Sequence, residues 1–168
     1  VDQQDSNRCT ALMHAAQFGH SRMVSTLLRR GADINHQDAK GNAALSFAAA
    51  SGHEQVVDAL LRVGAEVDRR SSLGCTALTS AANYGHTRVM EMLIRHGSEL
   101  ENRSCRGETA LMYAACYNHP AAALCLLRAG AEMAARNVDG ETALQIAKEK
   151  GSTECIEAFR THLAELAA

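Results

Sequence analysis

Three arginines recur in this sequence at equal intervals, at Arg70, Arg103 and Arg136, so that their numbers rise by 33 at each step. If each holds the same place in a repeated unit, the three guanidinium groups form a row with roughly the 8–10 Å spacing of packed helices. Such a row can bind carboxylates through paired N–H donors, so it predicts a surface for an acidic or carboxylate-bearing segment. The alternative is a set of solvated surface ion pairs with an acidic column four residues earlier, which consists of Asp33, Glu66, Glu99 and Glu132.

A second column at the same interval of 33 holds Phe18, Ser51, Tyr84, Tyr117 and Lys150, so that three of its five members are aromatic. Phe18, Tyr84 and Tyr117 are three of only six Phe and Tyr residues, and the chain has no Trp. Tyr113 lies one helical turn before Tyr117. Aromatic side chains on a surface anchor a partner well because they offer a large apolar area and, in tyrosine, a hydroxyl group. The column therefore predicts a binding surface; the alternative is that these rings pack against a neighbouring unit or pad a turn.

The eight histidines and six cysteines raise the question of metal or thiol chemistry. No two cysteines have the C-x2-C spacing of a structural zinc site, and no third group supports a Cys/His nucleophile. The Gly-x-x-Gly combinations fall in turn columns and do not indicate a phosphate loop. We therefore expect no metal, no cofactor, no catalytic residue and reduced thiols. A structural hydrogen bond is the expected role of a further column, which consists of His20, His53, His86 and His119.

A repeated element must position these columns, and the glycines reveal it. When the sequence is divided at intervals of 33 residues, all twelve glycines fall at three equivalent positions. These three columns begin at Gly19, Gly31 and Gly41, and Asn118 takes the place of one glycine. Self-similarity at this period is typical of a repeat array, and the length allows about five units. We predict units at 5–37, 38–70, 71–103, 104–136 and 137–168, which form a single domain over 1–168.

Each unit predicts two helices. A threonine before Ala-Leu is a good N-cap for the first helix, and at Ala43 the neighbouring Asn42 is expected to take over the cap. A Gly-His turn leads to a second helix with apolar residues at i, i+1, i+4 and i+5, from Val56 to Leu61 in the second unit. Neither helix can bury its apolar face alone, so neighbouring units must stack. The final helix, Thr153 to about Leu166, is expected to cap the stack.

The repeated pattern resembles the ankyrin repeat family from about Asp5 to Phe159. Residues 38–45 (DAKGNAAL) and 64–68 (GAEVD) are similar to the family motifs D-x-x-G-x-T-P-L and G-A-D-V-N, although alanine replaces the usual proline. The resemblance implies an all-α solenoid of stacked helix-turn-helix pairs with protruding β-turn fingers. It also implies a non-enzymatic module that binds a protein partner on its fingers and first helices.

The family's variable positions, numbered 2, 3, 5, 13, 14 and 33 within the unit, line its binding groove. Together with Tyr113, they select ten residues as the predicted partner-binding site: Phe18, Lys40, Arg70, Leu73, Tyr84, Arg103, Arg106, Tyr113, Tyr117 and Arg136. The expected ligand is an extended, acidic or carboxylate-bearing protein segment in the concave groove. The alternative is an architectural or regulatory array beside a catalytic domain of a larger parent protein, which a full-length sequence would distinguish.

Composition sets the remaining expectations. The formal net charge is -2, which excludes a globally basic nucleic-acid binder and makes nucleic acid an unfavoured partner. The sequence contains no apolar run of about 18 residues, so we expect no membrane span. We expect an intracellular monomer, in the cytoplasm or the nucleus.

Overall fold

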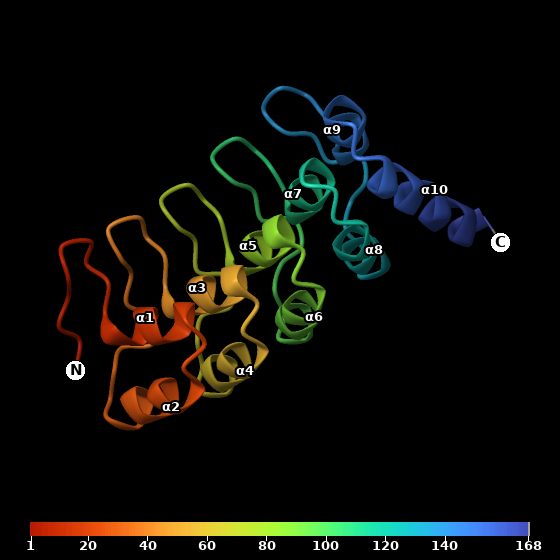
Figure 1. Ribbon diagram of the computed structural model, residues 1–168. Helices are drawn as coiled ribbons and strands as arrows, with labels where there is room; N and C mark the ends of the chain where they lie inside the picture. Colours follow the sequence, from red (N-terminus) through yellow and green to blue (C-terminus); the bar gives the residue numbers. More distant parts are fainter. Residues whose placement is uncertain (168) are drawn as a thin grey trace.

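The computed structural model describes residues 1–167, and within that range the chain forms ten α-helices arranged in five pairs (Figure 1). The first helices of the pairs, called inner helices here, are α1 (Ala11–Gln17), α3 (Ala44–Ser51), α5 (Ala77–Tyr84), α7 (Ala110–Cys116) and α9 (Ala143–Lys150). The second, outer helices are α2 (Ser21–Arg29), α4 (Glu54–Arg62), α6 (Thr87–Arg95), α8 (Pro120–Arg128) and α10 (Thr153–Ala167). The predicted all-α solenoid of helix-turn-helix pairs is confirmed.

The pairs stack in chain order. Each inner helix packs against the next inner helix, and each outer helix packs against the next outer helix. Figure 1 shows a gently curved row in which the loops that lead into the inner helices protrude along one edge. We call these loops the fingers; they comprise residues 1–10, 30–43, 63–76, 96–109 and 129–142. Among residues 1–167, no helix combines the length and the apolar character that crossing a membrane requires.

Four of the five inner helices follow the predicted threonines, which are Thr10, Thr76, Thr109 and Thr142. The hydroxyl group of Thr76 accepts a hydrogen bond from the N–H of Thr79, and the Thr79 hydroxyl accepts one from the N–H of Thr76, so the two residues form a reciprocal cap. The prediction for Asn42 is wrong: Ala43 is the N-cap of α3 and no side chain caps it. The Asn42 amide donates instead to Asp38 Oδ2 at 3.3 Å, because a residue before the N-cap faces the finger rather than the helix end.

The turn between the two helices of a pair also joins neighbouring pairs. Gly52 ends α3 with φ 74°, in the left-handed region that favours glycine. A Cβ atom at Gly52 would lie 2.6 Å from the His86 ring, so this position excludes a larger residue. The His86 Nε2–H donates to the Ala50 carbonyl at 3.0 Å, and His53 and His119 make the same bond to the preceding pair. The predicted structural role is confirmed for these three histidines, whereas His20 belongs to the first pair and has no preceding pair to bond.

The core lies between the helix layers. In α4 the predicted apolar stripe is buried, and Val56, Val57 and Leu60 are fully inaccessible to solvent. In α2 the apolar stripe is only partly covered, and Met23 is 53% exposed. The reason is that α2 belongs to the first pair, so it packs on α1 and on α4 but has no outer helix before it. At the other end α10 packs on α8 and α9 and buries Phe159. The last helix therefore packs against the preceding pair, at the place where the sequence analysis expects a cap.

Main-chain hydrogen bonds connect successive fingers. The N–H of Ser72 donates to the carbonyl of Lys40 at 2.8 Å, and the N–H of Cys105 donates to the carbonyl of Leu73 at 2.8 Å. Ala39 and Val138 make the equivalent bonds to Asn7 and Arg106. Because each finger is bonded to the previous one, the residues that the fingers carry are held at fixed positions along the edge.

Candidate functional site

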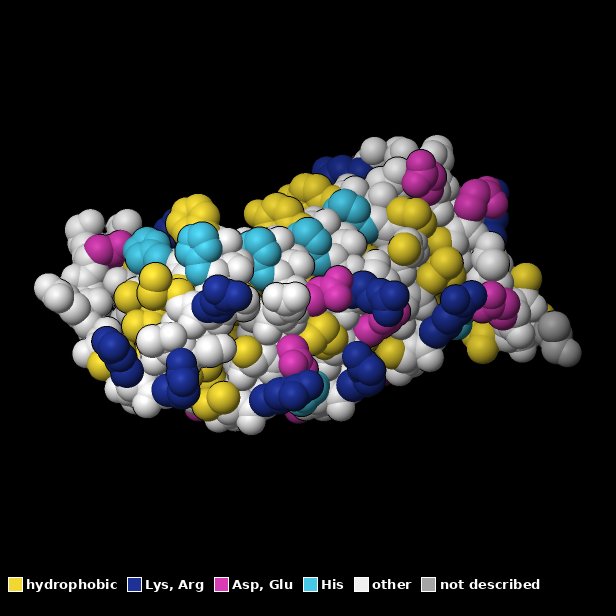
Figure 2. Space-filling model, turned by 60° about the horizontal axis from the view of Figure 1, so that its bottom comes forward, with side chains coloured by type: hydrophobic (Ala, Val, Ile, Leu, Met, Phe, Trp, Pro, Cys, Tyr) yellow, Lys and Arg dark blue, Asp and Glu magenta, His cyan; other side chains and the backbone are white. Residues whose placement is uncertain are grey.

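Three aromatic side chains border the inner helices at their C-terminal ends. Phe18 and Tyr117 are the C-cap residues of α1 and α7, and Tyr84 is the last residue of α5. They are 62%, 56% and 58% exposed, respectively. Their rings therefore do not pack into the core. The Phe18 and Tyr84 rings lie 6.3 Å from the rings of His20 and His86, and Figure 2 shows apolar side chains next to a row of histidines.

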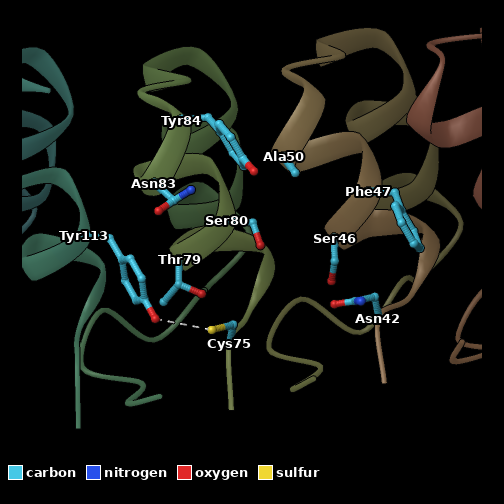
Figure 3. Close-up of a pocket in the computed structure, with 10 residues that line it drawn as sticks. All are labelled: Asn42, Ser46, Phe47, Ala50, Cys75, Thr79, Ser80, Asn83, Tyr84 and Tyr113. Atoms are coloured by element: carbon cyan, nitrogen blue, oxygen red, sulfur yellow. Dashed lines mark hydrogen bonds between the residues drawn. The ribbon is translucent and has the colours of Figure 1, made fainter. Parts of the chain in front are cut away.

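Tyr113, the fourth predicted aromatic residue, lies in a different environment. It lines a pocket of about 290 Å³ on the inner helices α3, α5 and α7 (Figure 3). The Tyr113 hydroxyl group lies 3.6 Å from Cys75 Sγ. Burial and then this hydrogen bond raise the pKa of the Tyr113 hydroxyl above its ordinary value. Half-buried and hydrogen-bonded, Tyr113 forms a wall of the pocket rather than a free anchor.

The same pocket contains residues that the sequence analysis missed. Phe47 of α3 and Ser80 of α5 occupy the position in their helices that Tyr113 occupies in α7, one repeat apart in each step. The small Ser80 side chain stands between two aromatic ones, which opens the space that Figure 3 shows. Comparison of this position between units would have predicted the pocket, since a small residue between two large ones leaves a gap in a stacked surface.

The predicted arginine row lies on the fingers, but each side chain also contacts the protein itself. Arg70 donates to the main-chain carbonyl of Arg103 at 2.6 Å, and Arg103 donates to that of Arg136 at 2.7 Å. Arg136 donates to the carbonyl of Gly140. All three residues are exposed, and a guanidinium group has five N–H donors. Each arginine therefore bonds within the fingers and keeps other donors directed to solvent.

The predicted alternative, ion pairs between the arginine row and the acidic column, is wrong. Glu66 pairs with Arg69 at 2.8 Å and not with Arg70, and among residues 1–167 none of the three row arginines forms an ion pair with an acidic side chain. The residues of the acidic column form hydrogen bonds through their main-chain N–H groups instead. The N–H of Glu66 donates to Asn35 Oδ1 at 3.0 Å, and the N–H groups of Asp33, Glu99 and Glu132 donate to side-chain oxygens of the preceding finger in the same way. Within the described part of the chain, the positive charge of the row is thus not paired with a carboxylate.

Lys40, Leu73 and Arg106 occupy equivalent positions at the tips of three fingers, and all are exposed. Leu73 is 62% exposed, unusual for a large apolar side chain, and Val138, which was not predicted, is 67% exposed on the last finger. Arg106 lies 3.6 Å from Asp139 of the next finger. The finger tips therefore carry both apolar and cationic groups. We call the exposed face of the inner helices and the adjoining sides of the fingers the groove.

The C-terminal end of the groove has a different charge. A cleft of about 880 Å³ there is lined by residues of the fourth and fifth pairs, including Tyr113 and Tyr117. Two cationic and four acidic side chains line it: Arg106, Lys150, Glu108, Asp139, Glu141 and Glu149. This end attracts cationic groups of a ligand, whereas the arginine row attracts anionic ones.

A second arginine column, which the sequence analysis missed, lies on the opposite side of the molecule. Arg29, Arg62, Arg95 and Arg128 stand in the last turns of α2, α4, α6 and α8. A cation there interacts favourably with the negative end of the helix dipole. Arg62 and Arg128 also pair with Asp58 and Glu165, at 2.8 Å each. This column has a local structural explanation, in contrast to the row on the fingers.

Comparison with known proteins agrees with the geometry. A family model described as ankyrin repeats (3 copies) matches residues 1–71 and residues 45–137. A comparison with curated proteins found no match. The matched segments include the first four helix pairs, and therefore most of the groove.

Proposed function

The chain belongs to the ankyrin repeat family, whose repeats are generally protein–protein interaction modules, and on that premise we propose that it is a non-enzymatic scaffold or adaptor. Its ligand is an extended segment of another protein that lies in the groove. Acidic or carboxylate groups of the segment bind along Arg70, Arg103 and Arg136. Apolar side chains of the segment pack on Phe18, Tyr84 and Tyr117.

The observation that carries this proposal is the exposure of three aromatic rings in one column. Surface apolar residues that occur singly need no explanation, but a row of them marks a binding site more often. Tyrosine anchors lose little conformational entropy on binding and cover a large area. The unpaired positive charge of the finger row supplies the polar half of the recognition, because exposed guanidinium donors bind carboxylates with defined geometry.

The charge of the groove also orients the segment. The four carboxylates of the C-terminal cleft disfavour acidic groups there, so the acidic positions of the segment lie outside the cleft, along the arginine row on the third to fifth fingers. The pocket between Phe47 and Tyr113 has room for a single side chain of moderate size. An extended chain passes from one unit to the next in about three residues, since it rises about 3.3 Å per residue and helices pack about 8–10 Å apart.

A peptide selection tests the proposal. Displayed random peptides are selected on the whole chain, and a selected peptide is titrated by calorimetry into wild type and into the Tyr84→Ala/Tyr117→Ala variant. We expect acidic peptides to be enriched and the double variant to bind at least about tenfold more weakly, as expected for loss of interface anchors. The matched control is Met23→Ala/Leu163→Ala, which removes two exposed apolar side chains of the outer helices α2 and α10. Equal affinity of wild type and the tyrosine variant would contradict the proposal.

A further inference from the structure

Three side chains that can bind metal ions meet at the N-terminal end of the solenoid. Donor atoms of Asp5, Cys9 and His14 all lie within 4.8 Å of one another, and in the described part of the chain no other group of three such residues does so. Asp5 Oδ2 and His14 Nε2 are 3.0 Å apart. None of the three belongs to the predicted binding residues of the groove, so the cluster needs an explanation of its own.

The main chain holds two of the three residues in place. Asp5 Oδ1 accepts hydrogen bonds from the N–H groups of Asn7 at 2.8 Å and Cys9 at 2.9 Å. The N–H of Asp5 donates to the carbonyl of Cys9 at 3.0 Å. These bonds occupy one carboxylate oxygen and leave Oδ2 directed at His14, which the helix α1 holds from the other side. The donor atoms are thus preorganised, which lowers the entropy cost of binding an ion.

The other repeats show that the fold brings the first two of these positions, those of Asp5 and Cys9, close together. In the second unit Asn42 donates to Asp38 Oδ2, and in the fourth Ser104 and Glu108 are hydrogen-bonded at 3.2 Å. The residues at the three positions differ, however. Only the first unit has a metal ligand at each of them, since the later units have Asp38, Asn42 and Phe47; Ser71, Cys75 and Ser80; Ser104, Glu108 and Tyr113; and Asn137, Glu141 and Ile146.

The charges around the cluster favour a cation. The Cys9 sulfur experiences the negative charges of both Asp5 and Asp38. Among residues 1–167, Asp5 forms an ion pair with His14 and with no lysine or arginine. The side chains of His14 and Asp5 are 50% and 40% exposed, so an ion can reach the cluster from solvent.

We infer that Asp5, Cys9 and His14 form a binding site for a divalent cation of the Zn²⁺ class. Thiolate sulfur, imidazole nitrogen and carboxylate oxygen are the ligands that Zn²⁺ takes, and three protein ligands leave the fourth tetrahedral position for water. Two such N and O ligands of one ion lie roughly 3.4 Å apart, so the observed pair needs to separate by only a few tenths of an ångström. Binding releases the Cys9 thiol proton to solvent and requires His14 to carry its proton on Nδ1.

The site is tested with Zn²⁺ and Co²⁺ on the whole, fully reduced chain. Calorimetry with Zn²⁺ measures the number of bound ions, and Co²⁺ reports its ligands because thiolate coordination gives an intense near-ultraviolet charge-transfer band. We expect one bound ion per chain, the band, and a higher melting temperature with Zn²⁺ present. This outcome is independent of peptide binding in the groove, so the site and the proposed function can fail separately.

The chain itself supplies variants that should fold. Asp5→Asn, Cys9→Asn and His14→Ser place at each position a residue that another unit carries there, namely Asn137, Asn42 and Ser80. Each should lose the bound ion and the rise in melting temperature, and Cys9→Asn should lose the Co²⁺ band. Cys75→Ser is the matched control and should retain all three. Absence of the band in wild type, or its survival in Cys9→Asn, would overturn the site.

Discussion

The guanidinium group of Arg70 donates a 2.6 Å hydrogen bond to the main-chain carbonyl of Arg103, the residue that holds the same position one repeat later. The bond joins two fingers, and its equivalents start from Gln37 and Arg103. The arginine row, which the sequence analysis interpreted by its charge, therefore also forms hydrogen bonds between successive repeats. These two roles depend on different properties of the side chain, its N–H donors and its charge, and substitutions can separate them.

The first prediction concerns stability. Arg70→Ala removes the donor and should lower the free energy of unfolding by about 0.5–1.5 kcal/mol, the usual contribution of one hydrogen bond. Arg70→Gln should have a smaller effect, because the Gln37 amide makes the equivalent bond to the Arg70 carbonyl at 3.0 Å. Urea unfolding of the two variants measures the difference. Equal destabilisation by both would indicate that the bond between fingers contributes nothing to folding.

The second prediction concerns binding. Replacement of Arg70, Arg103 and Arg136 by glutamine keeps amide donors for the fingers and removes three positive charges. The melting temperature should stay within a few degrees, while the affinity for a selected acidic peptide should fall and depend less on salt, since exposed charge contacts are screened. Calorimetric titrations at low and high salt measure both effects. Lys148→Gln, which removes a positive charge outside the predicted binding residues, is the control.

The third prediction concerns the core. Leu60 is fully buried in α4, so Leu60→Ala should cost about 2–5 kcal/mol in unfolding free energy, the usual range for a large-to-small core substitution. Met23→Ala removes an exposed side chain from α2 and should change stability by less than about 0.5 kcal/mol. Urea unfolding of both variants gives the comparison. Similar costs for the two would mean that burial in the outer helices does not determine stability.

The fourth prediction concerns high pH. Burial, with a smaller contribution from the charge of Glu154, raises the pKa of Cys155 from 9.0 to about 11. The folded state favours the neutral thiol, which also donates to the Ala114 carbonyl at 3.4 Å. The stability that this group contributes is therefore complete below pH 9 and is lost as the pH rises towards about 11.

The measurement for Cys155 is the slope of unfolding free energy against pH between 9 and 11. Cys155→Ala should show a shallower decline than wild type, whatever its absolute stability. Cys105→Ala, which removes an exposed thiol, should leave the slope of the wild type largely unchanged. If the unfolding free energy of Cys155→Ala and of wild type declined with the same slope, the loss of stability at high pH would come from groups other than Cys155.

The sequence by itself determined the repeat and what lies within one repeat. Glycine columns at a constant interval, the threonine caps and the apolar stripe from Val56 to Leu61 predicted the helix pairs and their buried face. Short-range features of this kind follow from sequence spacing, because a helix places residues three and four apart on one side. The exposure of Tyr84 and Tyr117 agrees with the predicted binding surface, but the sequence left open that these rings pack against a neighbouring unit.

Only the tertiary structure decided what meets between repeats and across a finger. The partner of Arg70 is a carbonyl one full repeat later, and the pocket beside Tyr113 depends on side chains from three helices. Asp5 and His14 come together because the first finger folds back onto α1. The spacing within one repeat leaves the offset between stacked repeats and the path of the finger undetermined, and those two quantities set which side-chain atoms come within bonding distance.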